Sequence, residues 1–499
     1  MIFLNFVRRN YGLILVLLLS FWAIRPFFIP GFFPMHDDTQ VARVFEMGKM
    51  LGSGVFPVRW VPDLGYGYGY PIFNFYAPLA YYVGGLFILL GFDALIATKL
   101  MMILGIILAG VFMYLLTKEF FGELGGLVSG LFYLYAPYHA VDIYVRGDAA
   151  EFWAYAFIPL MILGLYKRSI LIGSIGFAGV ILSHNLTALM VTPFLLIAIL
   201  LNCYIVPKGK KLLILYHSSL ILFLGLAVSA FYWIPALLEI KNTNVFSQIG
   251  GGADFRDHFV CIQQLWTSNW GFGGSTKSCI DGLSLMIGKL HIFSVFSSIF
   301  ILIYLKFKHK NFNDLPRGKA GIYYLSIFAI LGFIISIFLM LEVSRFIWQA
   351  ISLMAFFQYP WRFLLLTSFF SSLLSGFVVW FLQSEKPGLS TYFKPGLYIS
   401  VVFISLLLFL SLKFFVPQTI FPATAKDLTS ERALKWVASK TSDEFLPPDF
   451  EKPKSEHEIA KNPIPFKETT LEKASNTVSL IGALALIIGI ISRYGKNKR

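Results

Sequence analysis

Apolar stretches of about 20 residues alternate with short polar stretches along nearly the whole chain. A helix needs about 20 consecutive apolar residues to cross a bilayer core roughly 30 Å thick. The pattern therefore predicts an all-α membrane protein with many crossings. Twelve spans are expected, at residues 11–29, 94–117, 124–141, 152–166, 169–184, 186–206, 212–234, 286–305, 321–341, 363–382, 397–416 and 476–492.

One further apolar stretch, residues 76–91, is short and contains Pro78 and a pair of glycines. If this stretch crosses the membrane, every later segment lies on the opposite side from the one it would otherwise have. Both chain ends are basic, and basic segments flanking spans stay in the cytoplasm, so the number of crossings should be even. Twelve crossings satisfy this condition and thirteen do not. We therefore expect residues 76–91 to lie in the membrane interface or to re-enter it.

The charge distribution agrees with twelve crossings. The formal net charge of +14 falls almost entirely on the short segments that this topology places in the cytoplasm, and the rest of the chain is close to neutral. Because the cations are spread over short loops, no nucleic-acid partner is predicted. With 57% hydrophobic and 14% charged residues, the chain is expected in the cytoplasmic (plasma or inner) membrane, with both termini in the cytoplasm.

Four outer segments are large enough to carry function. They comprise residues 30–93, 235–285, 342–362 and 417–475. The expected organisation is a transmembrane domain over 1–416, an outer segment or small domain over 417–475, and a last span with a basic tail over 476–499. The chain has no P-loop, G-x-G-x-x-G or H-E-x-x-H motif.

The three cysteines show no zinc-ligand spacing. Cys203 lies in a predicted span, where a packing role is expected. Cys261 and Cys279 share one outer segment, so either a disulfide or two free thiols is compatible with the sequence.

Two acidic clusters flank predicted spans, and twelve crossings place both on the outer face. The first is "HDD", with Asp37 and Asp38, and the second is "VDIYVRGDAAEFW", with Arg146, Asp148 and Glu151. An aspartate at a helix start is often only a cap, and Arg146 could simply pair with Asp142 or Asp148. Acidic residues at the mouth of an apolar bundle are nevertheless costly unless they pair, bind a metal or take part in chemistry.

Two further residues suit a lipid phosphate. Arg362, in "QYPWRFL", lies where an outer segment enters the membrane, and a guanidinium at headgroup depth matches the geometry of a phosphate. His184, in "LSHN", lies at an outer turn between two spans. The alternatives are a membrane anchor for Arg362 and a helix cap for His184.

The sequence resembles a family of bacterial membrane proteins labelled "6-pyruvoyl-tetrahydropterin synthase-related". The resemblance rests on "HDD", "GSGVFPVRWVPDLGYGYGYPIFNFYAPLAYY", "APYHAVDIYVRGDAAEFWAYAFIPL", "LSHN", "QYPWRFL" and "DEFLPP", and it runs from about residue 25 to 450. The label does not describe the chemistry, since this chain lacks the three-histidine zinc site of a soluble pterin synthase.

The layout also resembles the GT-C superfamily of multispan glycosyltransferases, which use polyprenyl-phosphate-linked sugars at the outer face. This resemblance implies a GT-C-like helix bundle with juxtamembrane helices in the first outer loop, one of them at 76–91. It makes Asp37 the acid of that loop, acting as catalytic base or metal ligand, with Asp38 beside it. Arg146, Asp148 and Glu151 then form the second cluster.

The implied reaction is an inverting sugar transfer to an envelope glycan, lipid or protein. A carboxylate takes the proton of the acceptor hydroxyl, and Arg146, Arg362 and His184 face the departing phosphate. A divalent metal held by Asp37, Asp148 or Glu151 could share that work, and no other cofactor is expected. The competing interpretations are a flippase or transporter of lipid-linked glycans and a non-catalytic partner in envelope polysaccharide assembly.

Overall fold

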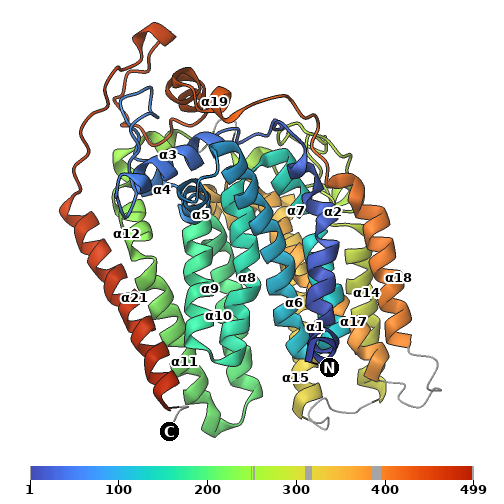
Figure 1. Cartoon of the computed structure of the whole chain (residues 1–499). Coiled ribbons are helices and arrows are strands. Elements are labelled where there is room, and N and C mark those ends of the chain that lie inside the picture. Colours follow the sequence, from blue (N-terminus) through green and yellow to red (C-terminus); the bar gives the residue numbers. More distant parts are fainter. Residues whose placement is uncertain (1, 249, 251–252, 309–316, 385–394, 497–499) are drawn as a thin grey trace.

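The computed structural model describes residues 2–248, 250, 253–308, 317–384 and 395–496. Its long helices run roughly parallel to one another and form a single bundle (Figure 1). They are α1 (Ile2–Leu19), α6 (Ala94–Leu134), α8 (Ala149–Lys167), α9 (Ile170–Ser183), α10 (Asn185–Ile205), α11 (Lys208–Val228), α14 (Lys289–Lys308), α15 (Arg317–Met340), α17 (Leu364–Ser384), α18 (Pro395–Ser411) and α21 (Thr470–Lys496).

Shorter helices gather mainly at one end of this bundle, the upper end in Figure 1. They include α2 (Phe21–Ile24), α3 (Gln40–Gly52), α4 (Ile72–Phe75), α5 (Leu79–Leu89), α7 (Pro137–Val141), α12 (Ala230–Leu238), α13 (Ile262–Trp266), α16 (Arg345–Ala350), α19 (Ala425–Leu428) and α20 (Ser439–Thr441).

The predicted all-α, multi-span fold is confirmed. Ten helices in the described part of the chain are long and apolar enough to cross a membrane. One of them, α6, is interrupted at Gly122, whose φ of 72° breaks it into two legs. Adding α9, an apolar helix of 14 residues, gives twelve segments that overlap the twelve predicted spans.

The predicted ends of two spans, 124–141 and 212–234, lie too far along the chain, since α11 ends at Val228 before α12 begins. The span expected at 124–141 ends with α6 at Leu134, and the chain then turns into α7. Pro137 has no N–H to donate to the preceding helix, and Ala136 before it has a ψ of 135°, outside the helical range. The polar residues that follow are therefore delivered by a turn at the end of the bundle.

Residues 76–91 do not form a long span. In Figure 1, α5 is seen end-on, lying across the upper end of the bundle against α3. Its glycine pair permits this close packing, because a Cβ on Gly84 would lie 2.7 Å from Val44 Cγ2 and one on Gly85 would lie 2.9 Å from Met47 Cγ. This is the arrangement expected for a juxtamembrane helix.

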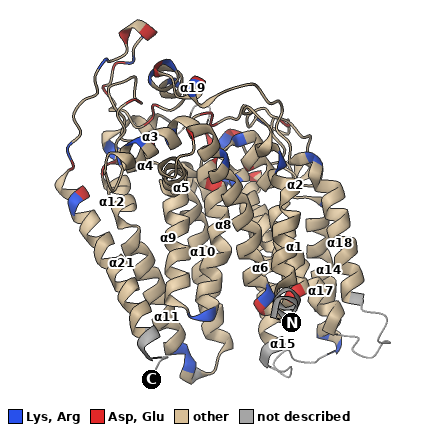
Figure 2. Ribbon diagram, viewed as in Figure 1, with Lys and Arg blue, Asp and Glu red and all other residues tan. Residues whose placement is uncertain are grey.

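The start of α1 and the end of α21 lie at the same, lower end of the bundle (Figure 1). An even number of crossings gives this arrangement. Charged residues concentrate at the two ends, and the middle of the bundle is almost free of them (Figure 2). The uncharged middle is what a bilayer core requires.

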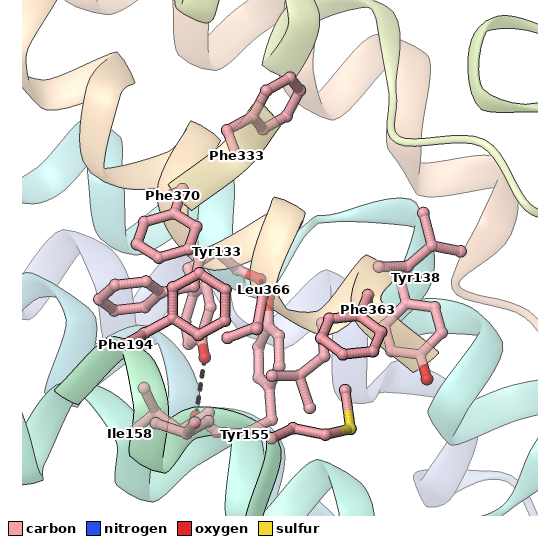
Figure 3. Close-up of a cluster of buried hydrophobic side chains, with 14 of the residues drawn as sticks. Tyr133, Tyr138, Tyr155, Ile158, Phe194, Phe333, Phe363, Leu366 and Phe370 are labelled. Carbon is pink, nitrogen blue, oxygen red and sulfur yellow. Dashed lines mark hydrogen bonds between the residues drawn. The ribbon is translucent and has the colours of Figure 1, made fainter. Parts of the chain in front are cut away.

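The core of the bundle is centred on α17, the most deeply buried of the long helices, with 94% of its span buried. Tyr133 of α6 and Tyr155 of α8 stack with ring centroids 3.8 Å apart, close to Phe194 and Phe370 (Figure 3). Each phenol donates to the other residue's backbone carbonyl, at 2.8 and 2.7 Å. The hydroxyl groups of the two tyrosines are therefore satisfied inside the apolar core.

Residues 417–469 follow α18 and fold back over residues 30–93, the first of the four segments predicted to be outer. We call residues 417–469 the cover segment. Phe32 and Phe421 exchange backbone hydrogen bonds. The N–H groups of Ala460 and Ile464 donate to the carbonyls of Tyr66 and Tyr68. The cover segment is thus held by residues nearly 400 positions earlier in the chain.

The "GYGYGYP" stretch at 65–71 forms the surface on which the cover segment packs. Gly65, Gly67 and Gly69 all have positive φ, which glycine adopts without strain. Two tyrosines of this stretch contact the cover segment. Tyr66 Oη donates to Asp443 at 3.0 Å, and Tyr70 Oη accepts the N–H of Phe445 at 3.1 Å. The Gly–Tyr alternation therefore serves a structural contact.

We expect Gly69→Ala to destabilise the fold more than Gly54→Ala. Both positions have positive φ, so each alanine costs about 1–2 kcal/mol of backbone strain. Only at Gly69 would the new Cβ meet a neighbour, the Trp60 ring at 2.0 Å, which adds about 1–3 kcal/mol of overpacking. Melting temperatures of the purified protein in detergent measure the difference.

Gly54 is the matched control because a Cβ added there would have no described atom within 4 Å apart from those of its two chain neighbours. Equal melting temperatures for the two variants would contradict the close contact between the glycine loop and Trp60.

Candidate active site

The turn between α6 and α8 carries the densest group of charges in the bundle. After α7, residues Asp142–Arg146 form one π-helical turn, and Gly147 adopts a left-handed conformation with φ 66°. A Cβ on Gly147 would lie 2.1 Å from Met35 Sδ, so only glycine fits. Asp148 then caps α8 by accepting the N–H of Glu151 at 3.0 Å. This sequence of turns directs four charged side chains to one place.

Arg146 lies at the centre of that group. Its guanidinium donates to Asp142 at 2.5 Å, to Asp148 at 2.7 Å and to Glu151 at 2.8 Å. It also lies over the Trp361 ring, 4.9 Å from the ring centre. All four charged residues are buried. Because an unpaired buried charge is very costly, this pairing is a condition for the turn to form.

The first outer loop docks directly on this turn. The N–H groups of His36 and Asp37 donate to the carbonyls of Val145 and Arg146 at 3.1 and 2.9 Å. Gln40 Nε2 donates to the Gly147 carbonyl at 2.8 Å. These bonds bring Asp37 beside the second acidic cluster, as the sequence predicted.

A cavity of about 610 Å³ opens beside these residues, and we call it the Asp37 cavity. All four outer segments line it. They contribute His36, Asp37 and Tyr76 from the first, Ser275 from the second, Gln358, Tyr359, Trp361 and Arg362 from the third, and Lys440, Asp443 and Glu444 from the cover segment, beside Arg146, Asp148 and His184.

The two aspartates of "HDD" differ in their surroundings. Asp37 is half-buried and lines the cavity. Burial and the negative charge of Asp148 raise its pKa to about 6, although Arg146 and Arg43 oppose the shift. Asp38 is exposed and is not among the residues that line the cavity. The structure therefore separates these two residues, which the sequence treated as one candidate site.

Asp148 is fixed as an anion. Burial opposes its ionisation, but the positive charges around it, Arg146 above all and also Arg362, outweigh burial and lower its pKa to about 2. Asp37 and Asp148 thus have pKa values on opposite sides of the usual range. Two neighbouring carboxyls with such different pKa values are suited to different roles, one exchanging a proton and one holding charge.

Arg362 is a buried charged group of the cavity that is only partly satisfied. It is 8% exposed, and its Nε and Nη1 have no hydrogen-bond partner among the described residues. Its nearest carboxylate oxygen is Oε2 of Glu151, 3.8 Å from Nε. Buried donors without partners are rare because they cost free energy, so this guanidinium is suited to an anionic ligand in the cavity.

His184 completes a group that could hold a metal. Asp148, Glu151 and His184 offer ligand atoms within 4.8 Å of one another. His184 Nδ1 bonds Thr187 Oγ1 at 2.7 Å, and burial lowers its pKa, which favours the neutral imidazole that binds metals. Two carboxylates and an imidazole fit a divalent ion by donor type. The metal-ligand group predicted from the sequence was Asp37, Asp148 and Glu151, whereas the group found in the structure has His184 in place of Asp37.

Several residues of the site were missed by sequence reasoning. Asp142 follows the i, i+4 spacing to Arg146, yet it was treated only as a pairing partner. Tyr138 donates to Glu151 and accepts from Arg146 at 3.1 Å. Glu444 reaches the cavity from the cover segment, and its only advance signal was the matching stretch "DEFLPP".

The second outer segment is closed by the disulfide Cys261–Cys279, which settles the open question about these thiols. The loop that it closes places Ser275 against Trp361, whose Nε1 donates to Ser275 Oγ at 2.9 Å. The disulfide-bonded loop therefore supports the ring that lies against Arg146.

No family model matches the chain. Over 255 residues it is 24% identical to an uncharacterized protein of Lactococcus lactis subsp. cremoris (strain MG1363), a match that covers 48% of this chain and 41% of that protein. The crystal structure of the Archaeoglobus fulgidus oligosaccharyltransferase, tethered with an acceptor peptide, gives a TM-score of 0.49 and 13% identity over 93% of this chain and 62% of that one. The chain thus matches less than two thirds of the length of either protein.

Substitution of Arg146 and of Arg362 should change the stability of the protein to different extents. We expect Arg146→Met to lower the free energy of unfolding by about 3–5 kcal/mol, because it leaves buried carboxylates without their cation. Arg362→Met should change stability far less, since most of its guanidinium has no hydrogen-bond partner in the described part of the chain. Thermal unfolding in detergent measures both. A similar loss of stability in the two variants would show that Arg362 is also a structural ion-pair residue.

Proposed function

We propose that the protein is a membrane glycosyltransferase that moves a sugar from a polyprenyl-phosphate donor to an envelope glycan, lipid or protein at the outer membrane face. The observation that carries the proposal is the buried guanidinium of Arg362, largely unpartnered by the described residues, in the same cavity as the Asp37 carboxyl. One group suits a phosphate, and the other suits a proton transfer. The sequence resemblance to GT-C enzymes points the same way.

The proposed chemistry uses these groups in one step. Asp37 accepts the proton of the acceptor hydroxyl while that oxygen bonds to C1 of the sugar. The bond from C1 to the phosphate oxygen breaks, and the electron pair leaves with the phosphate. Arg362 stabilises the charge that grows on the phosphate. A single displacement of this kind inverts the configuration at C1.

The remaining residues hold this arrangement in place. Arg146 pairs with Asp148 and Glu151 and positions the turn on which Asp37 docks. His184 faces the cavity beside them and is a second candidate for contact with the phosphate. A divalent ion held by Asp148, Glu151 and His184 would supply further charge stabilisation on the leaving group.

A transport function fits the described residues less well. A transporter for a charged lipid-linked glycan needs polar groups along a path through the bundle. The central helix α17 contains no charged residue, and its span is 94% buried. The charged groups of the site gather instead at one end of the bundle.

We expect Asp37→Asn to reduce sugar transfer by about 10²- to 10⁴-fold without loss of folding, because the amide cannot accept the proton. Asp38→Asn is the matched control, since it makes the same change one residue away and outside the cavity lining. Mass spectrometry of envelope glycans from cells carrying each variant measures the product. Full product with Asp37→Asn would rule out its role as base.

The activity should also fall at acidic pH. Asp37 must be ionised to act as a base, and its pKa is raised to about 6. The rate constant kcat/KM should therefore be level above this pH and drop about tenfold per unit below it. Initial rates in membrane vesicles, with the donor identified from the glycan analysis, give the profile. A rate that stays level down to pH 4 would mean that Asp37 has an ordinary pKa or does not act as the base.

A further inference from the structure

A second cavity lies between the start of α14 and the end of α18, and it shares no lining residue with the Asp37 cavity. Its volume is about 490 Å³. Its walls include Trp266, Trp270, Lys289, Leu407, Leu410 and Lys413, and we call it the Lys289 cavity. Phe293 of α14 and Phe403 of α18 pack 6.3 Å apart, so the two helices are neighbours within the bundle.

The charge lining this cavity is entirely positive. Lys289 and Lys413 line it, and no carboxylate of the described residues does. Neither lysine forms an ion pair with any residue that the structure describes. Each lies near an aromatic ring, with Lys289 Nζ 5.7 Å from the Trp266 ring centre and Lys413 Nζ 5.0 Å from that of Phe414. The cavity is therefore complementary to an anion.

The position of the cavity indicates that its ligand lies at the membrane surface. Lys289 is the first residue of α14, and Lys413 follows the last turn of α18, so both lie where an apolar span ends. Only 28% of the α18 span is buried, which leaves most of this helix facing outward. Lysine and tryptophan at such positions lie at the depth of lipid headgroups, with leucine below them at the depth of acyl chains.

The start of α14 supports a phosphate at this depth. Lys289 and Leu290, its first residues, line the cavity, and a helix N-terminus favours an anion. Trp270 lines the cavity beside them and is a residue type typical of the headgroup region. Gly288, just before α14, has φ 106°, and a Cβ there would lie 3.1 Å from Pro137. The end of the cavity that contains Lys289 is thus narrow and favourable to an anion.

We propose that the Lys289 cavity binds an anionic phospholipid, with its phosphate held by Lys289 and Lys413 and an acyl chain along the exposed Leu410. A small anionic solute would leave Leu410 uncovered, and a neutral lipid would leave two lysines unpaired. The proposal does not depend on the enzymatic function proposed above, because the two cavities are separate.

The test is native mass spectrometry of the full chain in detergent, titrated with phosphatidylglycerol or with phosphatidylcholine of the same acyl chains. Wild type should bind phosphatidylglycerol more tightly. A lysine near an anionic lipid is worth about fivefold in affinity, so the double variant Lys289→Gln/Lys413→Gln should lose roughly 25-fold. Lys289→Arg/Lys413→Arg should retain the preference because it keeps both charges.

The control is Lys241→Gln/Lys426→Gln, which removes two exposed lysines that do not line the cavity. This variant should bind phosphatidylglycerol as wild type does. Equal affinity of wild type for the two lipids, or an equal loss in the control, would overturn the proposal. Displacement of phosphatidylglycerol by inorganic phosphate at the same concentration would overturn it too, since it would identify a site for free anions.

Discussion

The structure depends on one buried arginine that holds three carboxylates together at the end of an apolar bundle. Arg146 pairs with Asp142, Asp148 and Glu151, and without it these anions would have to be solvated or protonated. The group still carries excess negative charge, which accounts for the second arginine, Arg362, beside Glu151. The two cations differ in their hydrogen bonds. Both Nη atoms of Arg146 donate to oxygens, whereas Nε and Nη1 of Arg362 find no hydrogen-bond partner within the described ranges. Burial, together with the negative charge of Asp148, raises the pKa of Asp37.

The site is assembled from segments that are far apart in the sequence. The first outer loop docks on the turn around Arg146 through backbone hydrogen bonds. The cover segment in turn docks on the glycine-rich stretch 65–71 of that first outer loop. A disulfide closes the second outer segment, which supports the Trp361 ring over Arg146. Together these contacts leave a cavity whose walls come from the four predicted outer segments and from the turns around Arg146 and His184. Arrangements of this kind place reactive groups at the end of a rigid scaffold, where loops carry the function.

Much of this could be predicted from the sequence, because span length and the charges of flanking segments are strong physical constraints. The spans, the absence of a long helix at 76–91 in the described chain and the meeting of Asp37 with Arg146, Asp148 and Glu151 all followed from hydropathy and an even number of crossings. Arg362 and His184 were placed by their position next to spans. The end of α6 was missed because an apolar run does not show where Pro137 turns the chain. Asp38 was grouped with Asp37 because adjacency in sequence says nothing about which side chain faces a cavity. Glu444 reaches the cavity only because the cover segment packs on a much earlier part of the chain, and hydropathy does not predict such contacts.

The central claim is that the Asp37 cavity is a site for a lipid phosphate, with Arg362 as its main contact. The most direct measurement is a cryo-electron microscopy map of the full chain with added polyprenyl phosphate. The account predicts density for the phosphate within hydrogen-bond distance of the Arg362 guanidinium, in the cavity that contains Asp37. A map at saturating lipid in which this cavity stays empty, or in which the phosphate lies only at another place on the bundle, would contradict it.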